Sequence, residues 1–324
     1  MNETQAPILA VENLKKYFPV RQGFFKREQA PVRAVDGVDL SIWPRHTLGL
    51  VGESGCGKTT VARLILRLLD PDSGIIRFNG QEISLLDEQR FKPLRKQIQM
   101  IFQDPYSSLN PRMTVAQSIA EGVRIAGIRE NTAQRRRIEQ LLSMVGMPKA
   151  SADRYPHEFS GGQRQRVGIA RALSVAPRLI LCDEPISALD VSIQAQIINL
   201  LKDLQQELGL SYLFISHDLN VVSYICDHVC VMYRGQIMES APAAEIFENP
   251  QHHYTLKLLA AAPNAELVGK AESIPPLATN PAAAQSPCSF APQCPEFAPA
   301  CAHEPPALRV VAPGHFVRCL PKAG

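Results

Sequence analysis

Residues 48–60 read Leu-Gly-Leu-Val-Gly-Glu-Ser-Gly-Cys-Gly-Lys-Thr-Thr, and this stretch decides the fold. The first four residues form a short apolar strand, residues 52–59 satisfy the G-x-x-x-x-G-K-[ST] pattern, and residues 61–69 continue as a helix. Glycines let backbone N–H groups turn toward phosphate oxygens, and the start of the helix adds its positive dipole end. Strand, loop and helix in this order therefore predict a phosphate-binding loop. Its candidate ligand-binding residues are Gly52, Ser54, Gly55, Cys56, Gly57, Lys58, Thr59 and Thr60.

Within that loop, two side chains carry chemistry of their own. Lys58 is placed to reach the β- and γ-phosphates of a nucleotide, and the Thr59 hydroxyl is placed to hold Mg²⁺.

A second apolar strand, residues 179–184, ends in the acids Asp183 and Glu184. Ligands bind outside the carboxyl ends of strands in open α/β sheets, so these acids are expected near the phosphate loop. Asp183 is a candidate Mg²⁺ ligand, and Glu184 is a candidate for orienting or deprotonating an attacking water. The alternative to a catalytic role is that Asp183 and Glu184 are simply two solvated acids at the end of a strand. The phosphate-binding loop earlier in the chain argues against this alternative.

Between these two motifs, residues 158–166 read Glu-Phe-Ser-Gly-Gly-Gln-Arg-Gln-Arg. A helix is expected from 163 to 174, so Ser160, Gly161 and Gly162 lie at its start, where an anion can bind. The ordered set of three motifs is far more specific than a phosphate loop alone. It indicates an ATPase whose active site is closed by a second subunit.

The arrangement along the chain predicts an α/β fold. Strand-like stretches alternate with helical ones around the two strands above, and the N-terminal strands, 8–14 and 32–42, lead into the sheet. Residues 104–176 lose their β-branched runs and show helical periodicity, which predicts a helical insertion. After about residue 262 the composition changes, since twelve of the 26 prolines lie in this tail, and irregular structure is expected there. The expected division is 1–262 for an ATPase domain and 263–324 for an extension.

The overall composition limits the kinds of partner that we expect for this chain. The net charge is only +3 over 324 residues, which gives no argument for nucleic acid. No apolar run approaches the roughly 18 residues that span a bilayer, and residues 1–7 lack a signal pattern. We therefore expect a cytoplasmic protein that reaches any membrane through partners.

With these motifs in place, the chain resembles the ATP-binding subunit of an ABC transporter. The resemblance implies a P-loop ATPase with a mixed sheet, an antiparallel N-terminal β-subdomain and a helical subdomain at about 104–176. It assigns Gln103 to the Q-loop, near the metal and the water, and His217 to the switch that contacts the γ-phosphate. Tyr17 is assigned to adenine stacking, and Asp190 lies in the D-loop, residues 187–190.

The run Ser160-Gly161-Gly162-Gln163 matches the signature motif, with Phe159 where leucine is usual. The resemblance implies that this run binds the nucleotide held by another subunit. Two ATP molecules would then lie between two subunits in a head-to-tail dimer.

Three further segments, residues 13–20, 49–58 and 103–112, resemble the second, F-type ATPase of bacterial dipeptide/oligopeptide importers. The run His252-His253-Tyr254-Thr255 resembles the His-Pro-Tyr-Thr entry to their extension, with His253 in place of proline. This implies a D-type ATPase partner, two integral membrane permease subunits and an extracytoplasmic binding protein, at the cytoplasmic face of the bacterial inner membrane. Nickel, glutathione or oligosaccharide cargo remains an alternative, as does a soluble ABC protein outside transport.

Four of the eight cysteines, Cys288, Cys294, Cys301 and Cys319, crowd into the tail. Disulfides are disfavoured in the cytoplasm, so the cluster suggests a metal site. The spacing resembles the extension in which some family members hold a [4Fe–4S] cluster. Thiolates at this density suit iron–sulfur or zinc, and free thiols are the remaining alternative.

Overall fold

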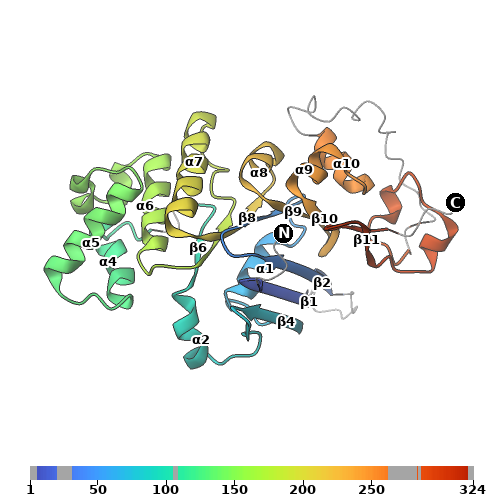
Figure 1. Cartoon of the computed structure of the whole chain (residues 1–324), viewed down its shortest axis with the longest axis horizontal. Coiled ribbons are helices and arrows are strands. Elements are labelled where there is room, and N and C mark those ends of the chain that lie inside the picture. The colour runs from blue at the N-terminus through green and yellow to red at the C-terminus, as the bar shows by residue number, and fades with distance from the viewer. Residues whose placement is uncertain (1–5, 20–30, 105–108, 262–282, 284–285, 320–324) are drawn as a thin grey trace, which may run out of the picture. The chain divides into compact units, whose positions relative to one another are not determined.

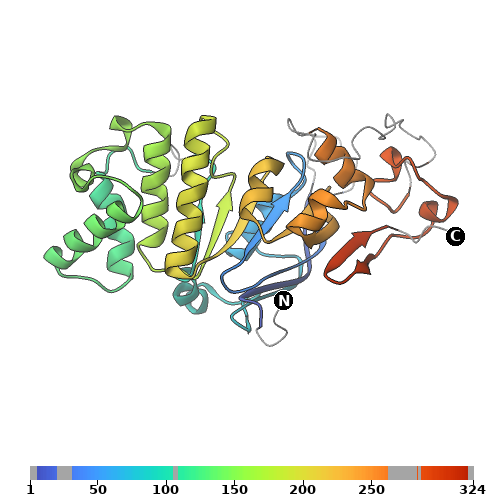
Figure 2. The same cartoon turned by 45° about the horizontal axis from the view of Figure 1, so that its top comes forward.

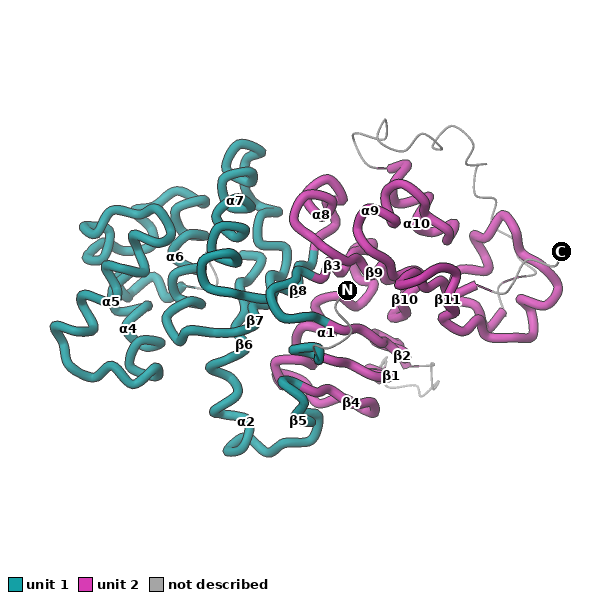
Figure 3. Tube along the Cα trace, viewed as in Figure 1, with its two compact units in different colours: residues 1–9, 42–47, 78–215 teal, residues 10–41, 48–77, 216–324 magenta. Residues whose placement is uncertain are grey.

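The computed structural model describes residues 6–19, 31–104, 109–261, 283 and 286–319. They form two compact units, which we describe one at a time (Figure 3). Unit 1 comprises residues 1–9, 42–47 and 78–215, and unit 2 comprises 10–41, 48–77 and 216–324. Residues 105–108, within the 103–112 stretch used above, lie outside the described residues, as does 262–282 of the proline-rich tail.

Unit 1 is built on a parallel ladder of β6, β7 and β8, whose strands are buried and apolar. A strand of a parallel sheet is covered on both faces, which explains the unbroken apolar run of β7. The strands of this unit are β5 (Gln81–Glu82), β6 (Ile98–Ile101), β7 (Leu179–Asp183) and β8 (Ser211–Ser216). Its helices are α2 (Glu88–Arg95), α4 (Val115–Ile125), α5 (Asn131–Met144), α6 (Gly161–Leu173) and α7 (Val191–Leu208), with 3-10 turns at Lys149–Asp153 and Pro156–Glu158.

The predicted helical insertion is present: α4, α5 and α6 pack together, and α6 runs beside α7 (Figures 1 and 2). Thr114 and Gln117 form a reciprocal capping box at the start of α4. Gly209, in the left-handed conformation, ends α7. The short helix α2 was not predicted, and Pro93 lies inside it.

Unit 2 contains the strand, loop and helix that the sequence predicted around residue 52. Its strands are β1 (Leu9–Phe18), β2 (Val32–Ile42), β3 (Thr47–Val51), β4 (Ser73–Phe78), β9 (His228–Tyr233), β10 (Gln236–Pro242), β11 (Leu308–Ala312) and β12 (His315–Arg318). Its helices are α1 (Lys58–Ile65), α8 (Leu219–Ile225), α9 (Ala243–Glu248) and α10 (His253–Ala260), with 3-10 turns at Ala291–Gln293 and Pro299–Ala302.

The strands of unit 2 form two sheets. Strands β2, β1 and β4 are neighbours in that order and form the N-terminal β-subdomain. In the other sheet β3 pairs with β9 in parallel, and β9 continues antiparallel through β10 to β12 and β11. Parallel and antiparallel pairs share one ladder, so the expectation of a mixed sheet is correct.

The expectation of an irregular tail is wrong for its last part. Strands β11 and β12 form a hairpin, and β12 pairs with β10 through Glu239–Val317 and Ser240–Phe316. The hairpin satisfies its backbone groups against residues nearly eighty positions earlier in the chain, a pairing that local composition does not reveal. Among the described residues, no helix is long and apolar enough to cross a membrane.

Candidate functional site

The phosphate loop joins β3 to α1 in unit 2, as the sequence predicted. Lys58 is the first residue of α1 and is buried. Its ammonium group donates to the carbonyl oxygens of Gly52 at 2.7 Å and Glu53 at 3.0 Å. The lysine is therefore held inside its own loop, at the base of the surface that would receive phosphates. Thr59 and Thr60 follow it, half-buried, in the first turn of α1.

The glycines at the two ends of the loop are required by close packing. A Cβ on Gly52 would lie 2.1 Å from the carbonyl oxygen of Met232, and one on Gly57 would lie 2.1 Å from that of Ala34. No side chain fits at such distances. A Cβ on Gly55 would meet nothing within 4 Å. Gly52 and Gly57 thus pack closely against backbone carbonyl groups, whereas the position of Gly55 has free space for a side chain.

Tyr17 lies in β1 of the same unit. Its hydroxyl donates a hydrogen bond of 2.5 Å to Asp36, and this bond to a carboxylate raises the pKa of the phenol. The Arg33 guanidinium lies 5.7 Å from the centre of the Tyr17 ring. The ring is therefore fixed in place, and its contact with adenine stays a prediction.

In unit 1, the acids that the sequence placed at a strand end lie at the end of β7. Asp183 is its last residue and is buried, and Glu184 follows it. The amide of Gln103 donates to the Glu184 carboxylate at 2.8 Å, so the structure brings together two of the predicted catalytic residues. Glu184 has φ of 47°, a left-handed conformation that is strained for a residue with a side chain. Strain of this kind persists where the surroundings impose it, and it clusters at functional sites.

Ser160 caps the N-terminus of α6. Its hydroxyl accepts from the Gln163 N–H at 3.4 Å, and the Gln163 side chain accepts from the Ser160 N–H at 3.1 Å. Ser160 is exposed, so the start of this thirteen-residue helix faces solvent. Phe159 is only 4% exposed, which shows that phenylalanine serves as the apolar residue before the motif.

Gly162 has a second reason to be glycine. A Cβ there would lie 2.4 Å from Cγ2 of Ile193 on α7. The glycine therefore allows α6 and α7 to approach closely, a packing role that the sequence did not reveal.

Two further predicted nucleotide residues, Asp190 and His217, lie at exposed positions. Asp190 stands directly before α7 and makes no side-chain cap hydrogen bond to it. His217, in unit 2, follows β8 directly and is exposed.

The four cysteines of the tail line one cavity of about 430 Å³ in unit 2. They are half-buried. Burial raises the pKa of Cys288 and Cys319, and it raises that of Cys294 to about 11. Arg318 also lines the cavity, and burial lowers the pKa of its guanidinium.

The thiols surround this cavity and do not converge on one point. Within the described ranges, no three His, Cys, Asp or Glu side chains are grouped closely enough to hold a single metal ion. The zinc alternative therefore has no preformed site among these residues.

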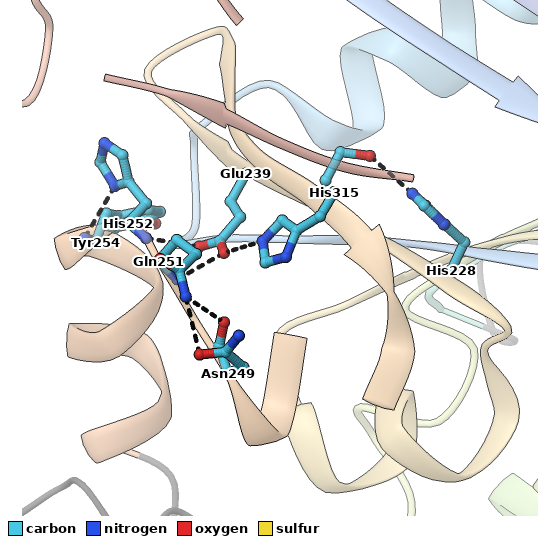
Figure 4. Close-up of polar contacts among 8 residues, drawn as sticks. His228, Glu239, Asn249, Gln251, His252, Tyr254 and His315 are labelled. Atoms are coloured by element: carbon cyan, nitrogen blue, oxygen red, sulfur yellow. Dashed lines mark hydrogen bonds and ion pairs between the residues drawn. The ribbon is translucent and has the colours of Figure 1, made fainter. Parts of the chain in front are cut away.

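Sequence reasoning missed a buried carboxylate that joins the extension to the sheet. Glu239 on β10 is fully buried and accepts from the N–H groups of Gln251 and His252 at 2.7 and 2.9 Å. The His315 ring of β12 lies 2.7 Å from the same carboxylate (Figure 4). A glutamate within an apolar strand was the only signal in the sequence.

The phosphate loop, the strand ending in Asp183-Glu184 and the capped Ser-Gly-Gly-Gln helix define the ATP-binding cassette class of P-loop ATPases. In agreement with this, residues 35–187 match the family model described as ABC transporter, and residues 238–301 match that of the oligopeptide/dipeptide transporter C-terminal region.

Individual relatives show which transport proteins within this class the chain is similar to. The chain is 49% identical, over 97% of both chains, to the oligopeptide transport ATP-binding protein AppF of Bacillus subtilis. It is 54% identical, over 80% of its length and 42% of the relative's, to the glutathione import ATP-binding protein GsiA of Salmonella choleraesuis. A solved dimeric ATP-binding cassette, MJ0796 in a post-hydrolysis state with ADP and Pi, covers 72% of this chain and 98% of its own, with 27% identity and a TM-score of 0.64. The chain belongs to the ATP-binding subunits of the ABC oligopeptide/dipeptide transporter family.

Proposed function

We propose that this chain hydrolyses ATP to power the import of di- or oligopeptides. The observation that carries the proposal is the match of residues 238–301 to the oligopeptide/dipeptide transporter region. The structure adds that this region belongs to the same compact unit as the phosphate loop. Glutathione is the second candidate cargo, favoured by the similarity to a glutathione import protein.

For nucleotide binding we assign the loop from Gly52 to Thr60. Lys58, held by its loop carbonyls, reaches the β- and γ-phosphates with its remaining donor, and the N–H groups around the open Gly55 surround the phosphate oxygens. Hydroxyl and carboxylate oxygens are the ligands that Mg²⁺ prefers, so Thr59 and Asp183 are its proposed ligands. A bound Mg²⁺ neutralises charge on the phosphates.

For hydrolysis we assign Glu184 as the residue that orients the attacking water and accepts its proton. The Gln103 amide, 2.8 Å away, holds this carboxylate in place. His217, exposed after β8, is the proposed γ-phosphate contact.

For assembly we assign Ser160, Gly161, Gly162 and Asp190 to the nucleotide of a partner subunit. The exposed, capped start of α6 supports this, because it presents N–H groups to an incoming phosphate. The proposed partners are a D-type ATPase and two membrane permease subunits, with a binding protein on the other side. The chain would then sit at the cytoplasmic face of the membrane.

Transport in proteoliposomes tests the cargo. Vesicles carrying the membrane subunits and both ATPases are supplied with the binding protein and with a labelled dipeptide, tetrapeptide or glutathione. We expect ATP-dependent peptide uptake, and its loss in the complex with Lys58→Ala. Uptake of glutathione alone would overturn the peptide assignment and leave the ATPase intact.

We also propose that the cavity of the extension holds an iron–sulfur cluster on Cys288, Cys294, Cys301 and Cys319. A volume of about 430 Å³ accommodates a multi-atom cluster, and thiols spread around it suit several iron atoms better than one ion. The half-buried Arg318 offers positive charge to an anionic, thiolate-bound group. A bound cluster would cross-link the 3-10 turns Ala291–Gln293 and Pro299–Ala302 to the end of β12.

Anaerobic purification tests this assignment. We expect stoichiometric iron and an absorption band near about 400 nm that is lost in Cys288→Ser. Cys230→Ser, at a buried thiol in β9, is the matched control and should keep the band. A colourless protein with stoichiometric zinc would contradict the cluster.

A further inference from the structure

The phosphate loop is contacted by α10, a helix within residues 238–301, the stretch that matches the oligopeptide/dipeptide transporter C-terminal region. The Tyr254 hydroxyl of α10 accepts the backbone N–H of Glu53 at 3.0 Å, and the Lys257 ammonium lies 3.1 Å from the Glu53 carboxylate. Glu53 is the second residue of the loop. One helix of this C-terminal region therefore holds both the backbone and the side chain of a phosphate-loop residue, and all of these groups lie in unit 2.

The Tyr254 hydroxyl is rigidly placed. Its residue is fully buried, and its ring packs against Tyr233 and Phe290 at centroid distances of 4.6 and 5.8 Å. The backbone N–H of Tyr254 donates to Nδ1 of His252, and the backbone N–H of His252 donates to the Glu239 carboxylate (Figure 4). The start of α10 is thus tied to the sheet, and the hydroxyl has a fixed position from which to hold the loop.

Lys257 is likewise placed from two sides. Besides the Glu53 carboxylate, its ammonium donates to the Gln293 side chain at 3.1 Å, next to Cys294. The lysine is therefore located between the loop and the wall of the cysteine-lined cavity.

Lys58 gives the loop a third hold, through the Gly52 and Glu53 carbonyl groups. A lysine at this position of the pattern also contacts the phosphates when nucleotide binds, so its three N–H donors are then shared between the loop and the phosphate oxygens. The contacts from α10 do not involve Lys58. They hold the loop from outside, independently of the lysine.

We propose that Tyr254 and Lys257 are positioning residues for the phosphate loop, which hold Glu53 while Lys58 contacts the nucleotide. The C-terminal region 238–301 then contributes directly to ATP affinity. The proposal rests on ATP binding and not on the cargo, so its failure would leave the import proposal untouched.

Calorimetric titration of the full-length chain with ATP tests the proposal. Tyr254→Phe keeps the packed ring and removes the acceptor, and we expect Kd for ATP to rise about three- to tenfold. The binding stoichiometry should stay unchanged, because the fraction of folded protein is the same. Tyr212→Phe removes a buried hydroxyl that bonds to the Leu201 carbonyl and not to Glu53 or Lys257, and its Kd should equal that of the wild type.

Lys257→Gln is the second variant and does not depend on core packing, since Lys257 is partly exposed. We expect Kd to rise about two- to fivefold, with recovery in Lys257→Arg. An unchanged Kd in both Tyr254→Phe and Lys257→Gln overturns the proposal. So does a fall in stoichiometry at constant Kd, or an equal rise in Tyr212→Phe, because either result indicates a merely structural role.

Discussion

At the residue scale, the hydrogen-bonded pair Gln103–Glu184 contains the proposed base for ATP hydrolysis in unit 1. Glu184→Gln should leave the Kd for ATP within about twofold and lower kcat by at least about 100-fold, because an amide cannot accept a proton from water. ATP binding by titration and phosphate release by the assembled ATPase pair measure the two effects. Glu207→Gln, at an exposed acid of α7, is the control and should keep full turnover. Normal turnover in Glu184→Gln would exclude this residue as the base.

The effect of Gly162→Ala on the free energy of unfolding should change sign when Ile193 is removed. Alanine gains about 1 kcal/mol of helix propensity over glycine. At 2.4 Å from Ile193, however, its Cβ overlaps a side chain, and overpacking costs about 1–3 kcal/mol. We expect Gly162→Ala to lower the free energy of unfolding by about 1 kcal/mol, measured by urea denaturation.

The double variant Gly162→Ala/Ile193→Ala separates the gain in helix propensity from the cost of overpacking. In an Ile193→Ala background the overlap is gone, and Gly162→Ala should then stabilise the protein by up to about 1 kcal/mol. Stabilisation in both backgrounds would show that close packing does not require this glycine.

At the scale of elements, the sequence predicted what local pattern controls. The phosphate loop with its strand and helix, the acids at the end of β7 and the capped helix after Ser160 were all placed correctly, because each depends on residues adjacent in the chain. The β11–β12 hairpin was missed although Pro313-Gly314 marks its turn, since an average over the proline-rich tail hid two short strands. The hold of Tyr254 on Glu53 spans some two hundred residues, and no local pattern encodes it.

The β9–β10 hairpin carries a half-buried histidine, His228, that makes stability depend on pH. Burial lowers the pKa of His228 to about 4, and its ring lies 2.9 Å from the Ser240 hydroxyl. The unfolded chain binds a proton near pH 6.5, whereas the folded chain does not until about pH 4. Stability is therefore full above pH 6.5 and is lost as the pH falls toward 4. Between pH 7.5 and 5 this group should cost about 2 kcal/mol.

The variant His228→Gln isolates this contribution. Glutamine can still bond to Ser240 but does not titrate, so its loss of unfolding free energy from pH 7.5 to 5 should be smaller than that of the wild type by about 2 kcal/mol. Parallel pH curves for the two proteins would contradict the assignment.

At the scale of the whole molecule, the chain carries two different phosphate-binding features. The loop around Lys58 lies in unit 2, and the capped start of α6 lies in unit 1. The first is wedged against its own protein at both ends and encloses its lysine. The second is exposed and has no lysine among its first helical residues. A single chain therefore offers one complete phosphate cradle and one helix terminus, which is the composition expected if the second serves a partner's nucleotide.

Ser160→Arg tests this division of labour. The substitution removes the N-cap acceptor and places a bulky side chain where an incoming γ-phosphate would approach the helix start. The Kd of the isolated chain for ATP should stay within about twofold, since Lys58 and its loop are untouched. Hydrolysis by the assembled pair should fall by at least about 100-fold, because stabilisation of charge on the transferring phosphoryl group is the main catalytic term. Ser143→Arg, at an exposed serine of α5, adds the same side chain elsewhere and should leave both values unchanged. If Ser160→Arg weakened ATP binding by the isolated chain, or left the pair fully active, the start of α6 would have no role at the partner's nucleotide.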